Sequence, residues 1–197
     1  VLVLMGIIGS LLIPQLKTEN PTKRGWDTLA KKMAENFQQA TTQMLAFNAS
    51  LDNLTILKQG DDIFSVADKD VTPKMADLYS QYLSKIEMNV DMSKPYFSQD
   101  LLDYKRKSLG IKINKAYSNF YHAADGILVG YRFYGSCNAT EEFANPPKTR
   151  QHYQVTDICG SIFFDVNSYK KPNKLGSDQY IIPVGIKGIQ YDNGYGG

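Results

Sequence analysis

The sequence predicts an α+β fold in which a long N-terminal helix packs on a C-terminal antiparallel sheet. Three observations lead to this prediction. The chain starts with an apolar run, a stretch with helical periodicity follows to about position 48, and strand-like patterns appear after Gly110. We divide the chain into an apolar stem with a proline-containing joint, residues 1–25, and a globular body, residues 26–197.

The stem carries no charge, and its residues are Val1, Leu2, Val3, Leu4, Met5, Gly6, Ile7, Ile8, Gly9, Ser10, Leu11, Leu12 and Ile13. It is shorter than the roughly 20 residues that a membrane-spanning helix needs. It also lacks the basic start and the small-residue cleavage site of a signal peptide. We therefore expect the stem to be retained and to be the remainder of a longer apolar segment.

A helix that is apolar on all sides lies in lipid or among other helices. Gly6, Gly9 and Ser10 fall on one face of the stem, where small side chains let a neighbouring helix approach closely. The stem is therefore predicted to be embedded in a membrane or packed against copies of itself.

Pro14 and Pro21 interrupt the helix after the stem, because proline lacks a backbone N–H and clashes with the preceding turn. A second helix is predicted from Pro21 or Trp26 to Asn48. Its apolar residues keep a spacing close to 3.6 and are Leu29, Met33, Phe37, Met44 and Leu45. One face of this helix can therefore pack on the body.

The middle of the chain predicts a loop over residues 49–71 and two further helices. Thr72 is a good N-cap and Pro73 suits the first helical position, so the first of these helices is expected to run from Thr72 to about Asn89. The second is expected over Gln99–Ser108.

Four strands are predicted in the C-terminal part. They cover Lys112–Phe120, Ile127–Tyr134, Ile162–Val166 and Gln179–Ile186. In the second of these, branched and aromatic residues alternate with their neighbours in the period of a strand. Together they predict an antiparallel sheet.

Charge and cysteine content limit the function classes. The formal net charge is +2, from 22 basic and 20 acidic residues. No basic stripe is visible, so we expect no nucleic-acid contact. Cys137 and Cys159 are the two cysteines, and they either form one disulfide that closes a loop or remain as two buried thiols.

The apolar run VLVLMGIIGSLLIP resembles the N-terminus of type IV pilins and of the related pseudopilins of type II secretion. Mature chains of that family begin with a short Phe-Thr-Leu-x-Glu-like stretch, followed by an apolar run with a Gly-Ile-Ile-Gly-like element and a proline. The initial stretch with its glutamate is absent here, and Pro14 falls a few residues early. The resemblance implies that about five mature residues precede Val1; the alternative is that Val1 is the true start and the glutamate is lacking, as in some minor pseudopilins.

The C-terminal part is also similar to that family. A strand in these proteins runs into Asp-x-Asn, then Pro-Asn-x-x-Gly-x-Asp, then a closing strand. The matching residues are Asp165, Asn167, Pro172, Asn173, Gly176 and Asp178. Ser168 stands where the family usually has a glycine.

The resemblance implies a pilin-like fold and a structural subunit of a type IV pilus or pseudopilus, outside the cytoplasm. Its partners would be copies of itself, the inner membrane before assembly, and the assembly machinery. An extracytoplasmic location favours the disulfide between Cys137 and Cys159. The alternative is a membrane-tethered module that binds a ligand or mediates adhesion.

Asp157, Asp165, Asn167, Asn173 and Asp178 form an oxygen-rich group of the kind that calcium binds. Some pseudopilins bind calcium in a C-terminal loop. The alternative, which we favour, is that these side chains cap turns. The chain has two histidines and no hydrolase motif, so we expect neither catalysis nor another cofactor.

Overall fold

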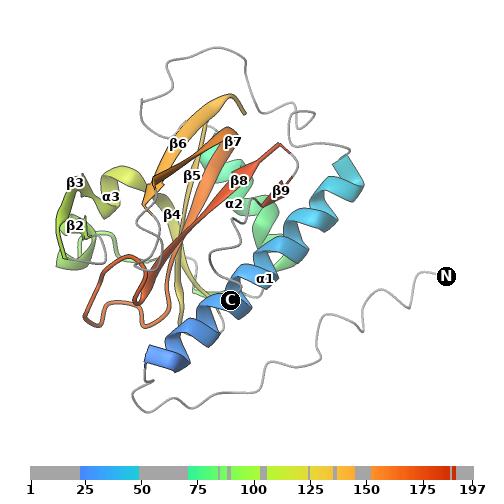
Figure 1. Ribbon diagram of the computed structural model, residues 1–197. Helices are drawn as coiled ribbons and strands as arrows, with labels where there is room; N and C mark the ends of the chain where they lie inside the picture. The colour runs from blue at the N-terminus through green and yellow to red at the C-terminus, as the bar shows by residue number, and fades with distance from the viewer. Residues whose placement is uncertain are drawn as a thin grey trace.

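The computed structural model describes residues 23–48, 71–83, 85–87, 90–102, 106–123, 125–134, 137–144, 152–186 and 188–189. Its helices are α1 (Lys23–Asn48), α2 (Val71–Tyr82), α3 (Ile113–Ala116) and the 3₁₀ helix η2 (Pro95–Ser98). Its strands are β1 (Lys85–Glu87), β2 (Asp100–Leu102), β3 (Ser108–Lys112), β4 (Ser118–Ala123), β5 (Leu128–Phe133), β6 (Ala139–Ala144), β7 (His152–Asp165), β8 (Gln179–Gly185) and β9 (Gly188–Ile189). The fold is α+β with one long N-terminal helix and an antiparallel sheet, as predicted (Figure 1).

The stem, Pro14 and Pro21 lie outside the described residues, as does the predicted loop up to residue 70. None of the helices in the described ranges has the length and apolar composition that a membrane crossing needs.

The main sheet has the strand order β1-β4-β5-β7-β8-β9, and every neighbouring pair is antiparallel. β7 is the longest strand and organises the sheet. Its second half pairs with β5 and with β8, whereas its first half pairs with β6, from Ala139 opposite Ile158 to Ala144 opposite His152. The strand predicted over Ile162–Val166 is therefore the end of a much longer element.

Helices α1 and α2 cover one face of this sheet (Figure 1). The predicted helix to Asn48 is confirmed as α1, and Leu29, Met33, Phe37 and Met44 of its predicted apolar face are buried. Met75 and Tyr79 of α2 join the same core.

Tyr79 fixes α2 against α1. Its ring centroid lies 5.8 Å from that of Phe37, and its hydroxyl lies 2.7 Å from the hydroxyl of Thr41. Both contacts are buried, so the two helices share an apolar and a polar contact.

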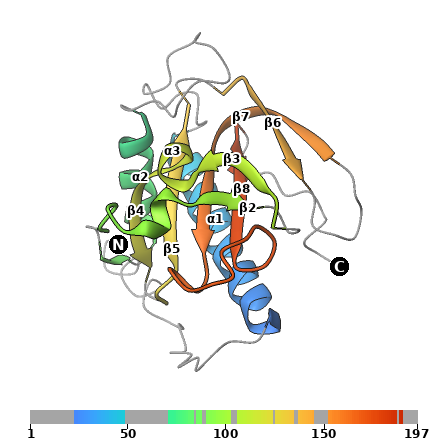
Figure 2. The ribbon, with the colours of Figure 1, turned by 90° about the vertical axis from the view of Figure 1, so that its left-hand side faces the viewer.

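A second core covers the opposite face, beneath α3 and the β2–β3 hairpin (Figure 2). Phe97, Phe120 and Phe163 are buried there, with ring centroids 4.8 Å apart for the first two and 6.3 Å apart for the last two. The ring of Phe120 lies over Gly130 of β5, where a side chain would collide with it. The strand predicted over Ile127–Tyr134 is confirmed as β5 and is covered on both faces.

The helix predicted over Thr72–Asn89 is wrong in its second half, because it ends at Tyr82 and Lys85–Glu87 forms β1 on the edge of the sheet. Pairing with β4 there outweighs the local helical pattern. Thr72 is not the N-cap, since the helix begins at Val71. Its hydroxyl accepts the N–H of Phe133 at 3.0 Å and donates to the carbonyl of Phe133 at 3.2 Å.

The helix predicted over Gln99–Ser108 is also wrong, because this segment contributes to the β2–β3 hairpin. Leu101 is buried while both of its neighbours are half-buried, a strand period. The predicted strand Lys112–Phe120 is broken by α3, which buries Ile113 and Ala116 at a helical spacing of three. The strand predicted over Gln179–Ile186 is confirmed as β8.

Cys137 and Cys159 form a disulfide, which confirms the first of the two alternatives. The two cysteines are 22 residues apart in sequence, and the closed loop contains β6 and the first half of β7. A loop of this length stabilises a fold by about 3 kcal/mol in the chain-entropy model.

Replacement of Phe37 tests the packing of α1 on the sheet. Phe37 is fully buried, and its ring also contacts Tyr131 and Phe164, both at 6.4 Å between centroids. We expect Phe37→Ala to lower the free energy of unfolding by about 3–5 kcal/mol, because it leaves a cavity among aromatic rings. Urea unfolding followed by circular dichroism measures this.

The matched control is Gln38→Ala, at the next position on the exposed side of α1. It should change the free energy of unfolding by less than about 0.5 kcal/mol. Equal effects of the two substitutions would contradict the packing described.

Candidate functional site

The candidate site is the loop between β7 and β8, residues 166–178, drawn in orange and red at the end of the sheet where α1 begins (Figure 1). The hydroxyl of Tyr180, just after the loop, donates to a carboxylate oxygen of Asp27 in α1 at 3.1 Å. The loop therefore lies beside the first turns of α1.

Four of the five oxygen-bearing residues singled out in the sequence meet in this loop, namely Asp165, Asn167, Asn173 and Asp178. Asp157 does not join them, because it lies eight positions earlier on β7, roughly 25 Å away at the rise of an extended strand. The structure therefore corrects the predicted set by one residue.

Asp178 caps the loop. Its carboxylate accepts the backbone N–H of Asn173 at 2.7 Å, the N–H of Lys174 at 2.9 Å and the side-chain amide of Asn167 at 3.1 Å. Burial raises the pKa of Asp178, and these donors offset part of the increase. One carboxylate thus satisfies three donors that the tight turn would otherwise leave unpaired.

Asp165, at the end of β7, anchors the loop to the opposite core. It accepts the hydroxyl of Tyr96 at 2.6 Å, the side-chain amide of Gln179 at 3.2 Å and the N–H of Asn167 at 3.1 Å. Burial, with a smaller contribution from the nearby Asp178 carboxylate, raises the pKa of Asp165 well above its ordinary value.

The tip of the loop adopts a left-handed backbone at Ser168, where φ is 60°. Glycine adopts this conformation without strain, which explains why a glycine suits this position better than other residues. The hydroxyl of Ser168 lies 3.1 Å from Nε2 of His122 in β4.

Two partners of the loop come from η2 and its flank, and sequence reasoning missed them. Tyr96 bonds to Asp165, 69 positions away, and Gln99 accepts the side-chain amide of Asn173 at 3.3 Å. The sequence carries no signal for Tyr96, and it placed Gln99 only at the start of a helix that does not form, because contacts over such separations leave no local pattern.

Three buried amide oxygens around the two carboxylates lack a hydrogen-bond partner: Oδ1 of Asn167, Oδ1 of Asn173 and Oε1 of Gln179. They are acceptors of the kind that an ordered water or a hard cation takes. Within the described residues, no three His, Cys, Asp or Glu side chains are grouped so that they could hold a metal.

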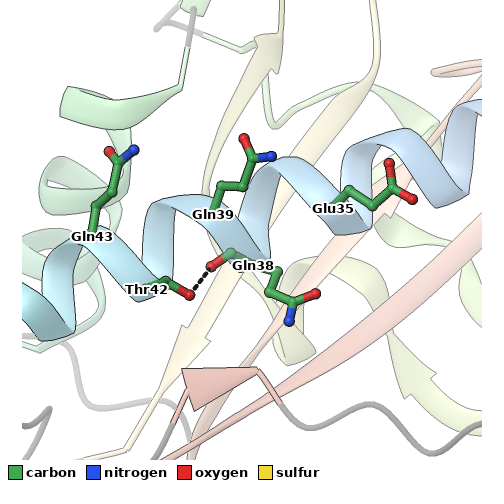
Figure 3. Close-up of a pocket in the computed structure, with 5 residues that line it drawn as sticks. All are labelled: Glu35, Gln38, Gln39, Thr42 and Gln43. Carbon is green, nitrogen blue, oxygen red and sulfur yellow. Dashed lines mark hydrogen bonds between the residues drawn. The ribbon is translucent and has the colours of Figure 1, made fainter.

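A shallow hollow of about 360 Å³ lies along α1, away from this loop. Its lining residues are all exposed and come from a single helix: Glu35, Gln38, Gln39, Thr42 and Gln43 (Figure 3). The hydroxyl of Thr42 donates to the backbone carbonyl of Gln38 at 2.9 Å. The hollow is an open groove along the exposed side of α1, and the described residues that line it are of polar and charged types.

Comparison of the chain with models of known protein families, with curated proteins and with solved structures found no match.

The raised pKa of Asp165 predicts a specific pH dependence of stability. An acid whose pKa is higher in the folded state than in the unfolded state stabilises the fold at pH values below the unfolded-state pKa. This contribution to the free energy of unfolding is lost as the pH rises through the folded-state pKa. We expect the free energy of unfolding, relative to that of Asp165→Asn, to fall from about pH 4 upward by at most about 1.4 kcal/mol per pH unit. Urea unfolding of both proteins across the pH range measures the difference.

Asp91→Asn is the control of opposite sign. Hydrogen bonds from Ser93 lower the pKa of Asp91 in the folded state. The contribution of Asp91 to the free energy of unfolding is therefore present at pH values above the unfolded-state pKa and is lost as the pH falls. A difference curve for Asp165 that rises with pH, like the one expected for Asp91, would show that burial does not dominate at Asp165.

Proposed function

We propose that the protein is a pilin-like structural subunit that polymerises through its stem into a helical filament outside the cytoplasm. The observation that carries the proposal is the position of α1. This helix of 26 residues begins ten positions after Ile13 and buries one face on an antiparallel sheet. The apolar stem is thereby joined to a helix that is fixed to the body.

Burial of the stem would drive assembly. Removing the stem from water is worth on the order of 10 kcal/mol or more at ordinary transfer energies per apolar side chain. Membrane and filament core compete as hosts for this surface, so the net gain on assembly is smaller. Contacts between copies that do not close on themselves generate a helical fibre.

The organisation of the β7–β8 loop supports the same proposal. The Asp165-x-Asn167 and Pro172-Asn173-x-x-Gly176-x-Asp178 positions form one hydrogen-bonded unit, so the C-terminal resemblance corresponds to a coherent structural element. The extracytoplasmic location agrees with the disulfide. The alternative of a ligand-binding module gains nothing from the hollow on α1, which is open and whose described lining residues all come from one helix.

We propose further that the loop is held by its own hydrogen bonds without a calcium ion. Both carboxylates already accept three hydrogen bonds each, and Lys170, Lys171 and Lys174 lie within the loop. The unpartnered amide oxygens are then acceptors for water.

Gly9→Leu tests the stem. A leucine side chain would separate stems that approach at the small-residue face, so we expect the variant to form no filaments in electron micrographs. The melting temperature of the body should not change, because the substitution lies outside it. Leu4→Ile, on the opposite side of the same helix, should assemble normally. Normal filaments from Gly9→Leu would contradict close packing of the stems.

Calcium dependence tests the second proposal. Excess calcium or a chelator should shift the melting temperature of the protein by less than about 1 °C, because a ligand that does not bind the folded state cannot stabilise it. An increase of several degrees with calcium, lost in Asp178→Asn, would show instead that the amide oxygens and carboxylates hold the ion.

A further inference from the structure

The end of the body where α1 begins carries a basic surface. Four lysines of the β7–β8 loop and of the segment before η2 contribute to it: Lys94, Lys170, Lys171 and Lys174. The first three are exposed and Lys174 is half-buried. None of the four lies within ion-pair distance of a carboxylate among the described residues. Their charges are therefore available to a partner.

Tyr169, in the β7–β8 loop, contacts the lysine of the segment before η2. The ammonium group of Lys94 lies 4.2 Å from the centre of the Tyr169 ring, which also contacts Tyr96 at 5.3 Å between centroids. Because Lys94 and Tyr169 are far apart in sequence, this contact brings the lysine before η2 next to the lysines of the loop. The lysine before η2 and the lysines of the loop therefore belong to the same end of the body.

The carboxylates that the structure describes near this surface are each held by another group. Asp125 is paired with Lys32 at 3.7 Å, and Asp165 and Asp178 are buried beneath the loop among hydrogen-bond donors. Carboxylates near the loop also include Asp91, beside Lys94 and bonded to Ser93, Asp27, which accepts from Tyr180, and the half-buried Asp100, which accepts from Ser108.

The location of the surface suggests its partner. Lys23 lies ten positions after Ile13, which limits the distance between the end of the stem and the start of α1 to at most about 35 Å. With the stem in a bilayer, the basic surface is the end of the body nearest the lipid headgroups. Each basic residue close to an anionic membrane surface strengthens binding by about fivefold.

We propose that this surface docks the body on the anionic phospholipid headgroups of the membrane that holds the stem before assembly. The inference rests on the proposed function, because it needs the stem in a bilayer. Docking fixes the orientation of the body, and it is released when the subunit enters a filament.

The test uses the full chain reconstituted into vesicles of phosphatidylcholine, with or without phosphatidylglycerol. A membrane-impermeant amine reagent modifies the exposed lysines, and mass spectrometry gives the rate at each position. We expect the four lysines to react at least about threefold more slowly in the anionic vesicles, and the protection to vanish at about 1 M salt, where the Debye length is about 3 Å. Lys74 of α2 and Lys115 of α3 should react equally in both.

Matched charge reversals separate docking from general attraction. Lys170→Glu with Lys171→Glu should abolish the protection of Lys94 and Lys174, whereas Lys74→Glu with Lys115→Glu, an equal change in net charge, should leave it intact. All four positions are exposed, so both variants should fold, and circular dichroism checks this.

Flotation of the vesicles distinguishes the two proposals. A chain that does not float with either vesicle has no membrane-embedded stem, and the proposed function fails. A chain that floats with both, with equal lysine reactivity in the two lipids, overturns the docking inference alone. Protection that is equal in both lipids and grows with protein concentration would assign the surface to a second copy, which also overturns it.

Discussion

The packing of Phe37 among aromatic rings connects parts of the molecule that are far apart in sequence. Its ring meets Tyr79 of α2, Tyr131 of β5 and Phe164 of β7, and all four side chains are fully or almost fully buried. Two helices and two central strands therefore depend on one cluster. This contact fixes the direction of α1 on the sheet, and so it determines at which end of the body Lys23, the start of α1, lies.

The β7–β8 loop shows how a short polar segment is kept rigid without regular secondary structure. Its backbone donors bond to two buried carboxylates, and one of these, Asp165, also reaches Tyr96 on the opposite core. Burial disfavours the charged form of both carboxylic acids, and this raises the pKa values of Asp165 and Asp178. The hydrogen bonds offset it, and the lysines of the loop remain at the surface.

Local patterns in the sequence predicted those elements whose burial is periodic and whose length is sufficient. The apolar spacing from Leu29 to Met44 predicted α1, and the runs at β5 and β8 predicted central strands. β1, β2 and β3 were missed because each is short and is stabilised by pairing with a distant or irregular partner. In the loop, the sequence indicated Asp165, Asn167, Asn173 and Asp178. Tyr96 and Gln99 could not be predicted, because they reach the loop only through contacts between residues far apart in sequence.

The disulfide affects which part of the chain can accept insertions. Because Cys137 and Cys159 are joined, β6 and the first half of β7 form a disulfide-closed part of the sheet in which the two strands pair with each other. The pairing of β5 with β7, from Gly160 to Asp165, lies outside this closed loop, and so does that of β8 except at Ile158. An insertion between β6 and β7 would therefore fall within the closed loop and leave the pairing of β5 with β7 unchanged.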